Sequence, residues 1–374
     1  MKNQESPQAI AEVDEILASV GLGHGRRQTL AGSWQNGQRL PRKPRPTATK
    51  PTSSASSTSP VEPVRAPDWQ QYAWLRHGFS TRAGGVSPVY DCGNGKGTLN
   101  LTWTAQDDPA NVAENRHRFL AQILNPAAKP STKRSEAATY DPRLITVRQI
   151  HSNLIRIIEP EDIAEPTRLH TTEGRAVLRG DGLITDVPGI VLGIQTADCV
   201  PVLVADTRTH AVAAFHAGWR GTLARIVERG IGTMRLRYGS RPQDLVAAIG
   251  PSIGPCCYAV SEELRFDFES QFAYAPELFT EVSDSDPIHD KYPLLFLTAR
   301  APGHSNIGPQ IHLDLWEANR RQLLDAGVPA KRITVIGECT ACTGLGTAAG
   351  RKYFSHRAES GFTGRMLAAI GVTE

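Results

Sequence analysis

The chain has 374 residues, of which 40% are hydrophobic and 21% charged, and its formal net charge is +3. This composition is typical of a water-soluble globular protein, and no apolar run approaches the roughly 20 residues that a membrane-spanning helix needs. Eight basic residues and one acidic residue fall between residues 25 and 66, so the rest of the chain carries −4 and shows no basic face for nucleic acid.

The first 66 residues differ in composition from the rest of the chain. Apolar residues at helical spacing between Ile10 and Val20 predict one short helix, and a stretch rich in Gly, Pro, Ser and Thr follows it. Such a stretch buries too little apolar area to offset chain entropy. We therefore expect residues 1–66 to form a disordered basic extension. Because the start of the chain lacks the apolar core of a signal peptide, we expect a cytoplasmic protein.

The remaining residues, 67–374, are expected to form one catalytic domain that alternates short apolar strands with amphipathic helices. A helix is predicted over 109–124, with Asp107 or Asp108 near its cap, and a strand over 144–150 ends at His151. The other expected elements are strands at 189–194, 200–205, 211–215, 245–249 and 333–336, helices starting at 221, 261 and 317, and polar or irregular segments at 127–140, 159–175 and 273–310.

Three residues with metal-binding side chains each lie at the end of an apolar run: His151, Cys199 and His216. They are separated by 48 and 17 residues, so the fold would have to assemble any site. Three protein ligands leave a fourth position for water or substrate, the pattern of catalytic zinc, and Asp198 would orient a ligand. Spacing alone also fits a small buried cysteine and two core histidines.

A metal-free alternative uses the same side chains. Cys199 beside His216 would form the thiolate and imidazolium pair of a cysteine hydrolase. Elsewhere, Arg220 at the start of a helix and Arg82 beside two glycines are candidate anion contacts, although a plain capped helix and a plain turn explain them equally well.

The other cysteines give a weaker signal. Cys339 and Cys342 have CxxC spacing, but no second such pair exists, and the adjacent Cys256 and Cys257 do not have the usual spacing of a four-cysteine zinc site. The deaminase pattern HxE with PCxxC, the P-loop and the dinucleotide fingerprint are all missing.

Short sequence blocks, found in one order from about residue 68 to the end, resemble the YfiH family. This family is also known as the peptidoglycan editing factor or polyphenol oxidase (laccase-domain) family. The blocks are Phe79–Ser87, Asn100-Leu101, Asn115-Arg116, Gln149 with His151, Asp181-Gly182, Thr196–Cys199, His216–Gly221, Gly250–Ile253, Cys257-Tyr258, Leu313–Leu315, Phe354–Arg357 and Thr363–Arg365.

The resemblance implies a fold and an activity. The fold is an α/β sandwich, with mixed β-sheets packed together and flanked by helices. The activity is phosphorolysis of adenosine, inosine, guanosine and methylthioadenosine, with adenosine deamination as a second reaction. The family's metal ligands match His151, Cys199 and His216, which would hold zinc, or copper in older descriptions of the family. Within the matching blocks we expect substrate contacts at Arg82, Asn100, Asp198, Arg220 and Arg357.

The expected partners are therefore a purine nucleoside and phosphate, and we expect no nucleic acid and no membrane among them. The protein itself is expected to be a monomer. Three rival interpretations remain open. One is a hydrolase that edits peptidoglycan precursors through Cys199 and His216. The second is a copper-dependent polyphenol oxidase, which ranks lower because such enzymes hold several coppers with many histidines. The third is a metal-bound scaffold whose N-terminal extension recruits a partner.

Overall fold

The computed structural model describes residues 59–91, 97–127, 141–282, 310–347 and 350–373, and the backbone of residues 34–35 and 38–39. The chain divides into two compact units, Met1–Pro51 and Thr52–Glu374. In the first unit, β1 (Trp34–Gln35) and β2 (Gln38–Arg39) pair antiparallel. The helix expected between Ile10 and Val20 lies outside the described residues, as does nearly all of the expected disordered extension.

The second unit includes residues that the sequence placed in the extension. Val61 and Ala66 are buried in its cores, and Val64 pairs with Phe79 through two backbone hydrogen bonds of 2.8 Å. Folded structure in this unit therefore begins by residue 59, ahead of the expected boundary at 66.

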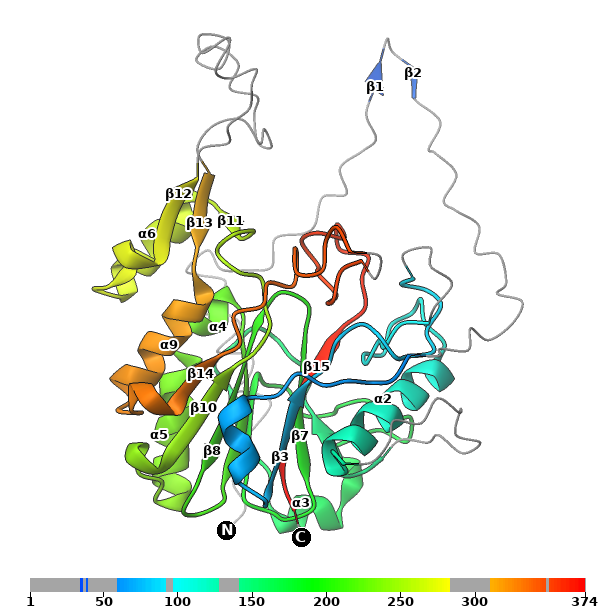
Figure 1. Cartoon of the computed structure of the whole chain (residues 1–374), viewed down its shortest axis with the longest axis vertical. Helices are drawn as coiled ribbons and strands as arrows, with labels where there is room; N and C mark the ends of the chain where they lie inside the picture. Colours follow the sequence, from blue (N-terminus) through cyan, green and yellow to red (C-terminus); the bar gives the residue numbers. More distant parts are fainter. Residues whose placement is uncertain are drawn as a thin grey trace, which may run out of the picture. The chain divides into compact units, whose positions relative to one another are not determined.

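Two mixed β-sheets form the centre of the second unit (Figure 1). The larger sheet has the strand order β14 (Ile333–Val335), β10 (Leu245–Ile249), β8 (Val200–Asp206), β9 (Val212–Ala217), β6 (Gly182–Thr185) and β5 (Ile155–Ile157). The smaller sheet has the order β3 (Leu75–Phe79), β15 (Met366–Val372), β7 (Val191–Thr196) and β4 (Leu144–Thr146). Pairings are antiparallel except β10–β14, β5–β6 and β4–β7.

The two sheets pack face to face because their strands alternate between two apolar faces. In β8, Leu203 and Ala205 join the core between the sheets, whereas Val202 and Val204 join the core under the helices. The same period of two runs through β9, β10 and β15. Strands buried on both faces read as continuous apolar runs, which is why the sequence shows them so clearly.

Helices cover the outer faces of both sheets. The outer face of the large sheet packs against α4 (Trp219–Leu223), α5 (Ile226–Tyr238), α6 (Glu262–Gln271) and α9 (Leu315–Asp325). The outer face of the small sheet is covered by α2 (Pro109–Leu124), which packs against it through Phe119, Leu120 and Ile123. The layers are thus helix, sheet, sheet and helix, which confirms the expected α/β sandwich.

Smaller elements complete the second unit. A three-stranded sheet has the order β11 (Ala259–Val260), β13 (Gln310–Leu313) and β12 (Phe279–Val282), beside α6 (Figure 1). The short helices are α3 (Pro160–Ala164), η1 (Pro67–Gln71), η2 (Pro166–Arg168), η3 (Pro242–Asp244), η4 (Ala275–Leu278) and η5 (Ala330–Arg332). Nearly all of the polar segment at 127–140 and most of the irregular segment at 273–310 lie outside the described residues.

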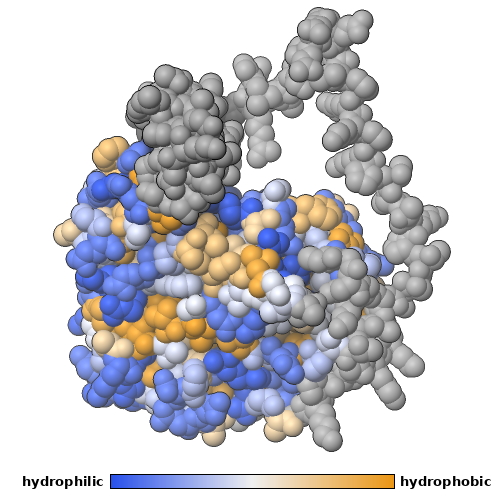
Figure 2. Space-filling view, turned by 45° about the horizontal axis from the view of Figure 1, so that its top comes forward, coloured by the Kyte–Doolittle hydropathy of each residue, from blue (hydrophilic) through white to orange (hydrophobic). Residues whose placement is uncertain are grey.

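The face drawn in Figure 2 is mostly hydrophilic, with a band of hydrophobic residues across it. Scattered apolar residues are normal on a water-facing surface and by themselves assign no partner. Within the described part of the chain, no helix has the length and apolar character needed to span a bilayer.

Candidate metal centre and active site

The structure brings His151, Cys199 and His216 together at one edge of the large sheet. Cys199 directly precedes β8, and His216 lies near the end of β9, opposite Pro201 of β8. His151 comes from the loop after β4, in a left-handed conformation with φ 59°. Antiparallel pairing of β8 and β9 places the start of one strand beside the end of the other, so the sheet itself delivers Cys199 and His216 to one place.

The three side chains have the spacing of ligands to a single metal ion. Their ligand atoms all lie within 4.8 Å of one another, and Cys199 Sγ is 4.0 Å from His151 Nε2. Zinc bonds of about 2.3 Å to sulfur and 2.0–2.1 Å to nitrogen imply ligand atoms roughly 3.5 Å apart. A small closing movement would therefore satisfy a zinc ion. His216 is buried and His151 exposed, so one side of the cluster faces solvent.

Asp181, directly before β6, organises this cluster. Its carboxylate accepts hydrogen bonds from the backbone N–H groups of Ile150, His151 and Ser152, and from the Ser152 hydroxyl. The same carboxylate lies 2.8 Å from His216 Nδ1. Since an ionised carboxylate only accepts, Nδ1 carries a proton, and Nε2 is the ring nitrogen that would bind a metal once its own proton is displaced. The Asp181 carboxylate thus orients the His216 ring and also holds the loop that carries His151.

Charges within the cluster shift its pKa values strongly. Burial raises the pKa of Cys199, but His216 and His151 outweigh it and bring that pKa down to about 6. Burial lowers the pKa of His216, but Cys199 and Asp181 outweigh it and raise that pKa to about 9. Burial raises the pKa of Asp181, and hydrogen bonds from His216 and Ser152 overcome this and lower it to about 2. The cluster therefore favours a sulfur anion, the form of cysteine that binds metals.

Asp198 supports the residue beside it. It has φ 91°, and its carboxylate accepts a hydrogen bond of 2.7 Å from the Thr340 hydroxyl and one of 2.6 Å from the Arg357 backbone N–H. Its carbonyl accepts from the N–H of Ile253. These contacts fix the unusual backbone turn that presents Cys199, so Asp198 has a positioning role in this structure.

Arg82 and Asn100, expected as substrate contacts, are buried and engaged within the protein. The Arg82 guanidinium pairs with Glu359 at 3.0 Å and donates to the carbonyl of Tyr90. The Asn100 amide donates to Asp107, and its oxygen accepts from the N–H of Arg365. Both side chains therefore have a structural role, since their bonds hold together the loops around β3 and β15.

Arg220 and Arg357 are exposed cations beside the cluster. The Arg220 guanidinium stacks on Trp219, 4.2 Å from the ring centre, and has no hydrogen bond or ion pair within the described part of the chain. Arg357 donates to the carbonyl of Ala259 and lies over Tyr258. Burial raises the pKa of Tyr258 to about 12, with Cys199 adding to the shift and both arginines opposing it, so the phenol, the arginines and the thiol share one neighbourhood.

The four cysteines that local spacing did not predict to be a metal site lie together in the structure. The sulfur atoms of Cys256, Cys257, Cys339 and Cys342 are all within 4.8 Å of one another. They meet because the loops after β10 and β14, which are neighbouring parallel strands, leave the sheet at the same edge.

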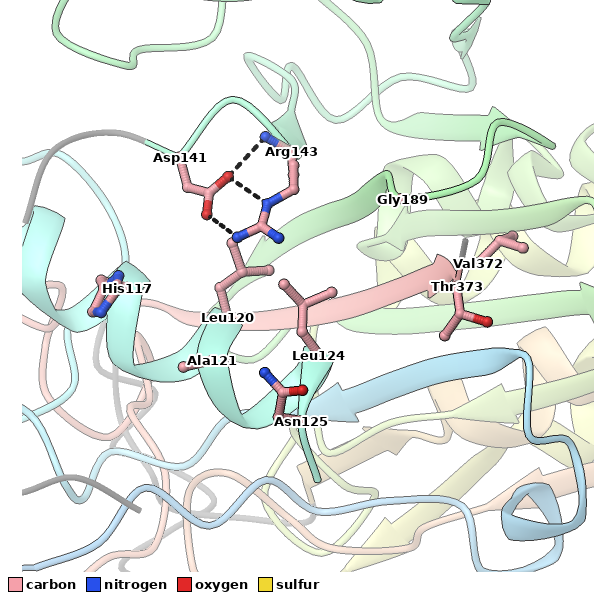
Figure 3. A pocket seen from close by; sticks show the side chains of 10 residues that line it. All are labelled: His117, Leu120, Ala121, Leu124, Asn125, Asp141, Arg143, Gly189, Val372 and Thr373. Carbon is pink, nitrogen blue, oxygen red and sulfur yellow. Dashed lines mark hydrogen bonds and ion pairs between the residues drawn. The ribbon is translucent and has the colours of Figure 1, made fainter. Parts of the chain in front are cut away.

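A separate hollow of about 480 Å³ lies at the far end of the small sheet (Figure 3). Its lining includes Leu124 of α2, Gly189 before β7, Val372 at the end of β15, and an ion pair of 2.7 Å between Asp141 and Arg143. The cluster of His151, Cys199 and His216 adjoins Thr196, at the other end of β7, so this hollow is not part of the candidate site.

A family model described as multi-copper polyphenol oxidoreductase laccase matches residues 76–373. The chain belongs to this family. Among relatives of this laccase-domain family, purine nucleoside phosphorylase YlmD of Geobacillus stearothermophilus is 33% identical over 306 residues, which cover 80% of this chain and 95% of YlmD. Adenosine deaminase RL5, from an unknown prokaryotic organism, is 34% identical over 200 residues, covering 53% of this chain and 66% of RL5.

The fold is shared with solved members of the laccase-domain family. The crystal structure of a hypothetical protein YfiH from Bacillus licheniformis matches with a TM-score of 0.63 and 28% identity, covering 84% of this chain and 97% of that one. The resemblance drawn from the sequence blocks is thereby confirmed.

Proposed function

We propose that the chain is a purine nucleoside phosphorylase that holds zinc through His151, Cys199 and His216 and also deaminates adenosine. The observation that carries the proposal is the three-ligand cluster at the sheet edge, with two exposed arginines beside it. The names of YlmD and RL5 support the two reactions. Adenosine, inosine, guanosine and methylthioadenosine are the proposed nucleosides, and copper is the alternative metal.

Zinc bound by these ligands would supply a Lewis acid at an open coordination position. The chain's own residues would do the positioning. Asp181 keeps the His216 ring in one tautomer and orientation, and Asp198 fixes the backbone before Cys199. Such supporting groups matter because a ligand set that is only slightly misplaced loses both metal affinity and reactivity.

In phosphorolysis, a phosphate oxygen bonds to C1′ of the ribose while the bond from C1′ to the purine nitrogen breaks. The electron pair of that bond goes to the purine, which takes up a proton, and the products are the free base and ribose 1-phosphate. The reaction needs a cationic cradle for phosphate, and guanidinium groups bind phosphate oxygens in pairs. Arg220 and Arg357 are proposed for this role because they are exposed and close to Tyr258 and Cys199.

In deamination, a water oxygen adds to C6 of adenine and ammonia leaves, giving inosine. This reaction needs no phosphate, so the two activities are separable in the test tube. Purified protein given adenosine and phosphate is expected to form adenine and ribose 1-phosphate, whereas adenosine without phosphate gives only inosine. Both activities should disappear after treatment with a chelator and return when zinc is restored.

The phosphate assignment is tested with Arg220→Ala. Loss of one guanidinium that contacts phosphate should raise the apparent KM for phosphate about tenfold or more and leave deamination nearly unchanged. Arg235→Ala is the matched control, since Arg235 is an exposed arginine in the last turn of α5. An unchanged phosphate KM in Arg220→Ala would remove Arg220 from the site.

A second candidate function is a hydrolase in which Cys199 is the nucleophile, His216 the base and Asp181 the residue that orients it. The contact between Asp181 and His216 favours it, because a nucleophile, a base and an orienting carboxylate are the parts of a hydrolytic triad. Release of L-serine from a UDP-muramyl peptide precursor, with no turnover of any nucleoside, would favour this candidate. A copper oxidase ranks lower because, among the described residues, only one candidate metal group contains histidine.

A further inference from the structure

We infer that Cys256, Cys257, Cys339 and Cys342 form a second metal site, which holds one zinc ion as a structural ligand set of four thiolates. Four sulfur ligands that close the coordination sphere are the pattern of structural zinc, in contrast to the open three-ligand cluster described above. The inference stands on the geometry of these cysteines and does not rest on the proposed activity.

The distances fit a single ion. A tetrahedral zinc with bonds of about 2.3 Å to sulfur places its ligand sulfurs about 3.8 Å apart. Here Cys256 Sγ and Cys342 Sγ are 3.6 Å apart, and all four sulfurs lie within 4.8 Å of one another. A disulfide bond is about 2.05 Å long, and these cysteines are free thiols. An iron–sulfur cluster would place its ligands on different irons and so spread them further apart.

The surroundings of the cysteines suit thiolate ligands. The backbone N–H of Gly254 donates to Cys339 Sγ at 3.2 Å, a contact that stabilises negative charge on sulfur. Arg351 donates to the carbonyl of Ala341, between the two cysteines of the CxxC turn, and brings positive charge to a site whose ion and ligands sum to −2. Cys339 is buried and Cys256 exposed, so an ion has a path from solvent.

The site would join two loops that hold the candidate active site. Cys256 and Cys257 are in the loop after β10, and Cys339 and Cys342 are in the loop after β14. The first loop supplies the N–H of Ile253 and the second the hydroxyl of Thr340, and both groups bond to Asp198, the neighbour of Cys199. A metal that binds both loops would thus hold in place the residues that position Asp198 and Cys199. Binding releases the thiol protons and transfers no electrons.

The test is the zinc content of the full-length protein, purified with a reductant, supplied with zinc and then dialysed. Wild type is expected to hold two zinc ions per chain, and Cys339→Ser/Cys342→Ser one. Cys199→Ala should also hold one, and its X-ray absorption spectrum should show four sulfur neighbours at about 2.3 Å. Cys92→Ser is the matched control, because Cys92 is the one cysteine of the sequence outside both clusters, and it should keep two.

Failure of this inference is distinguishable from failure of the proposed function. If wild type holds one zinc, lost in Cys339→Ser/Cys342→Ser and kept in Cys199→Ala, the four-cysteine site stands and the catalytic metal does not. If Cys339→Ser/Cys342→Ser binds as much zinc as wild type, the inference is overturned.

Alkylation of the wild-type protein provides a second measurement should the double variant not fold. Zinc is expected to protect these four cysteines from iodoacetamide, while Cys92 reacts equally with and without zinc. Equal modification of all four in both conditions, or a disulfide among them in the reduced and zinc-loaded protein, would overturn the inference.

Discussion

At the scale of single residues, the candidate centre depends on the absence of a side chain at Gly218. A Cβ atom there would lie 2.8 Å from Cys199 Sγ and 3.3 Å from His151 Cδ2, closer than real Cβ atoms come to sulfur. The backbone at Gly218 has φ −64°, which any residue adopts without strain. The glycine is thus required by the space that two candidate ligands occupy, and not by its backbone conformation.

We therefore predict that Gly218→Ala weakens zinc binding at the His151 cluster by at least about tenfold, since the new methyl group must displace Cys199 or His151. Competition with a chelator measures the affinity. Gly232→Ala is the control: nothing lies within 4 Å of its added Cβ inside α5, so alanine should leave zinc binding intact and stabilise the fold by up to about 1 kcal/mol. Equal zinc affinity in Gly218→Ala and wild type would contradict this account of the site.

At the scale of elements, the sequence was most informative where the signal is local. The expected helix over 109–124 is α2, with Asp108 as its cap, and the expected strand over 245–249 is β10. The helix expected from residue 221 is two helices, because Arg225 between them takes a left-handed conformation with φ 55°. No glycine or proline marks that break, so the sequence pattern gave no sign of it.

Elements and contacts that depend on distant partners were harder to predict. β15 is central in the small sheet, yet its sequence MLAAIGV is rich in residues that favour helix, and only pairing with β3 and β7 on its two sides makes it a strand. The candidate site likewise has residues that sequence motifs predict and residues that only the fold reveals. Motifs singled out His151, Cys199 and His216. The role of Asp181 and the four-cysteine group depend on which loops share a sheet edge, and one sequence does not show that.

The short segment before η1 is attached to β3 through a buried histidine. His77 Nε2 accepts a hydrogen bond of 3.0 Å from the Ala66 N–H, and its ring packs against Trp69. Burial, assisted by the charge on Arg65, lowers the pKa of His77 from 6.5 to about 4. Below pH 6.5 the unfolded chain binds the proton more readily than the folded one. The stabilisation is therefore complete above pH 6.5 and is lost as the pH falls toward 4.

We predict that His77 makes the free energy of unfolding about 2 kcal/mol lower at pH 5 than at pH 8. His77→Gln keeps an acceptor for the Ala66 N–H and does not titrate. Urea unfolding of both proteins at both pH values isolates the contribution of His77 to the free energy of unfolding. Other histidines, such as His170 with its own pKa lowered to about 4, contribute equally in the two proteins. The same loss of stability in His77→Gln and wild type would show that His77 is not its source.

At the scale of the whole molecule, the compact unit from Thr52 onward contains both candidate metal clusters and the described residues that support them. We predict that a chain of residues 52–374 matches the full-length protein in zinc content, activity and free energy of unfolding. A chain of residues 67–374 should be less stable by about 3 kcal/mol or more. It loses the burial of Val61, the paired backbone of Val64 and Phe79, and the N–H bound by His77.

Urea unfolding of the three chains measures the difference. Val61→Ala in the full-length protein extends the test if residues 67–374 do not fold, because removing two buried methyl groups should cost about 1–3 kcal/mol. Val177→Ala is its control, since Val177 is 46% exposed and its truncation should change the free energy of unfolding by less than about 0.5 kcal/mol. If residues 67–374 proved as stable as residues 52–374 and Val61→Ala were also neutral, the segment from 59 to 66 would contribute nothing to the fold despite its burial.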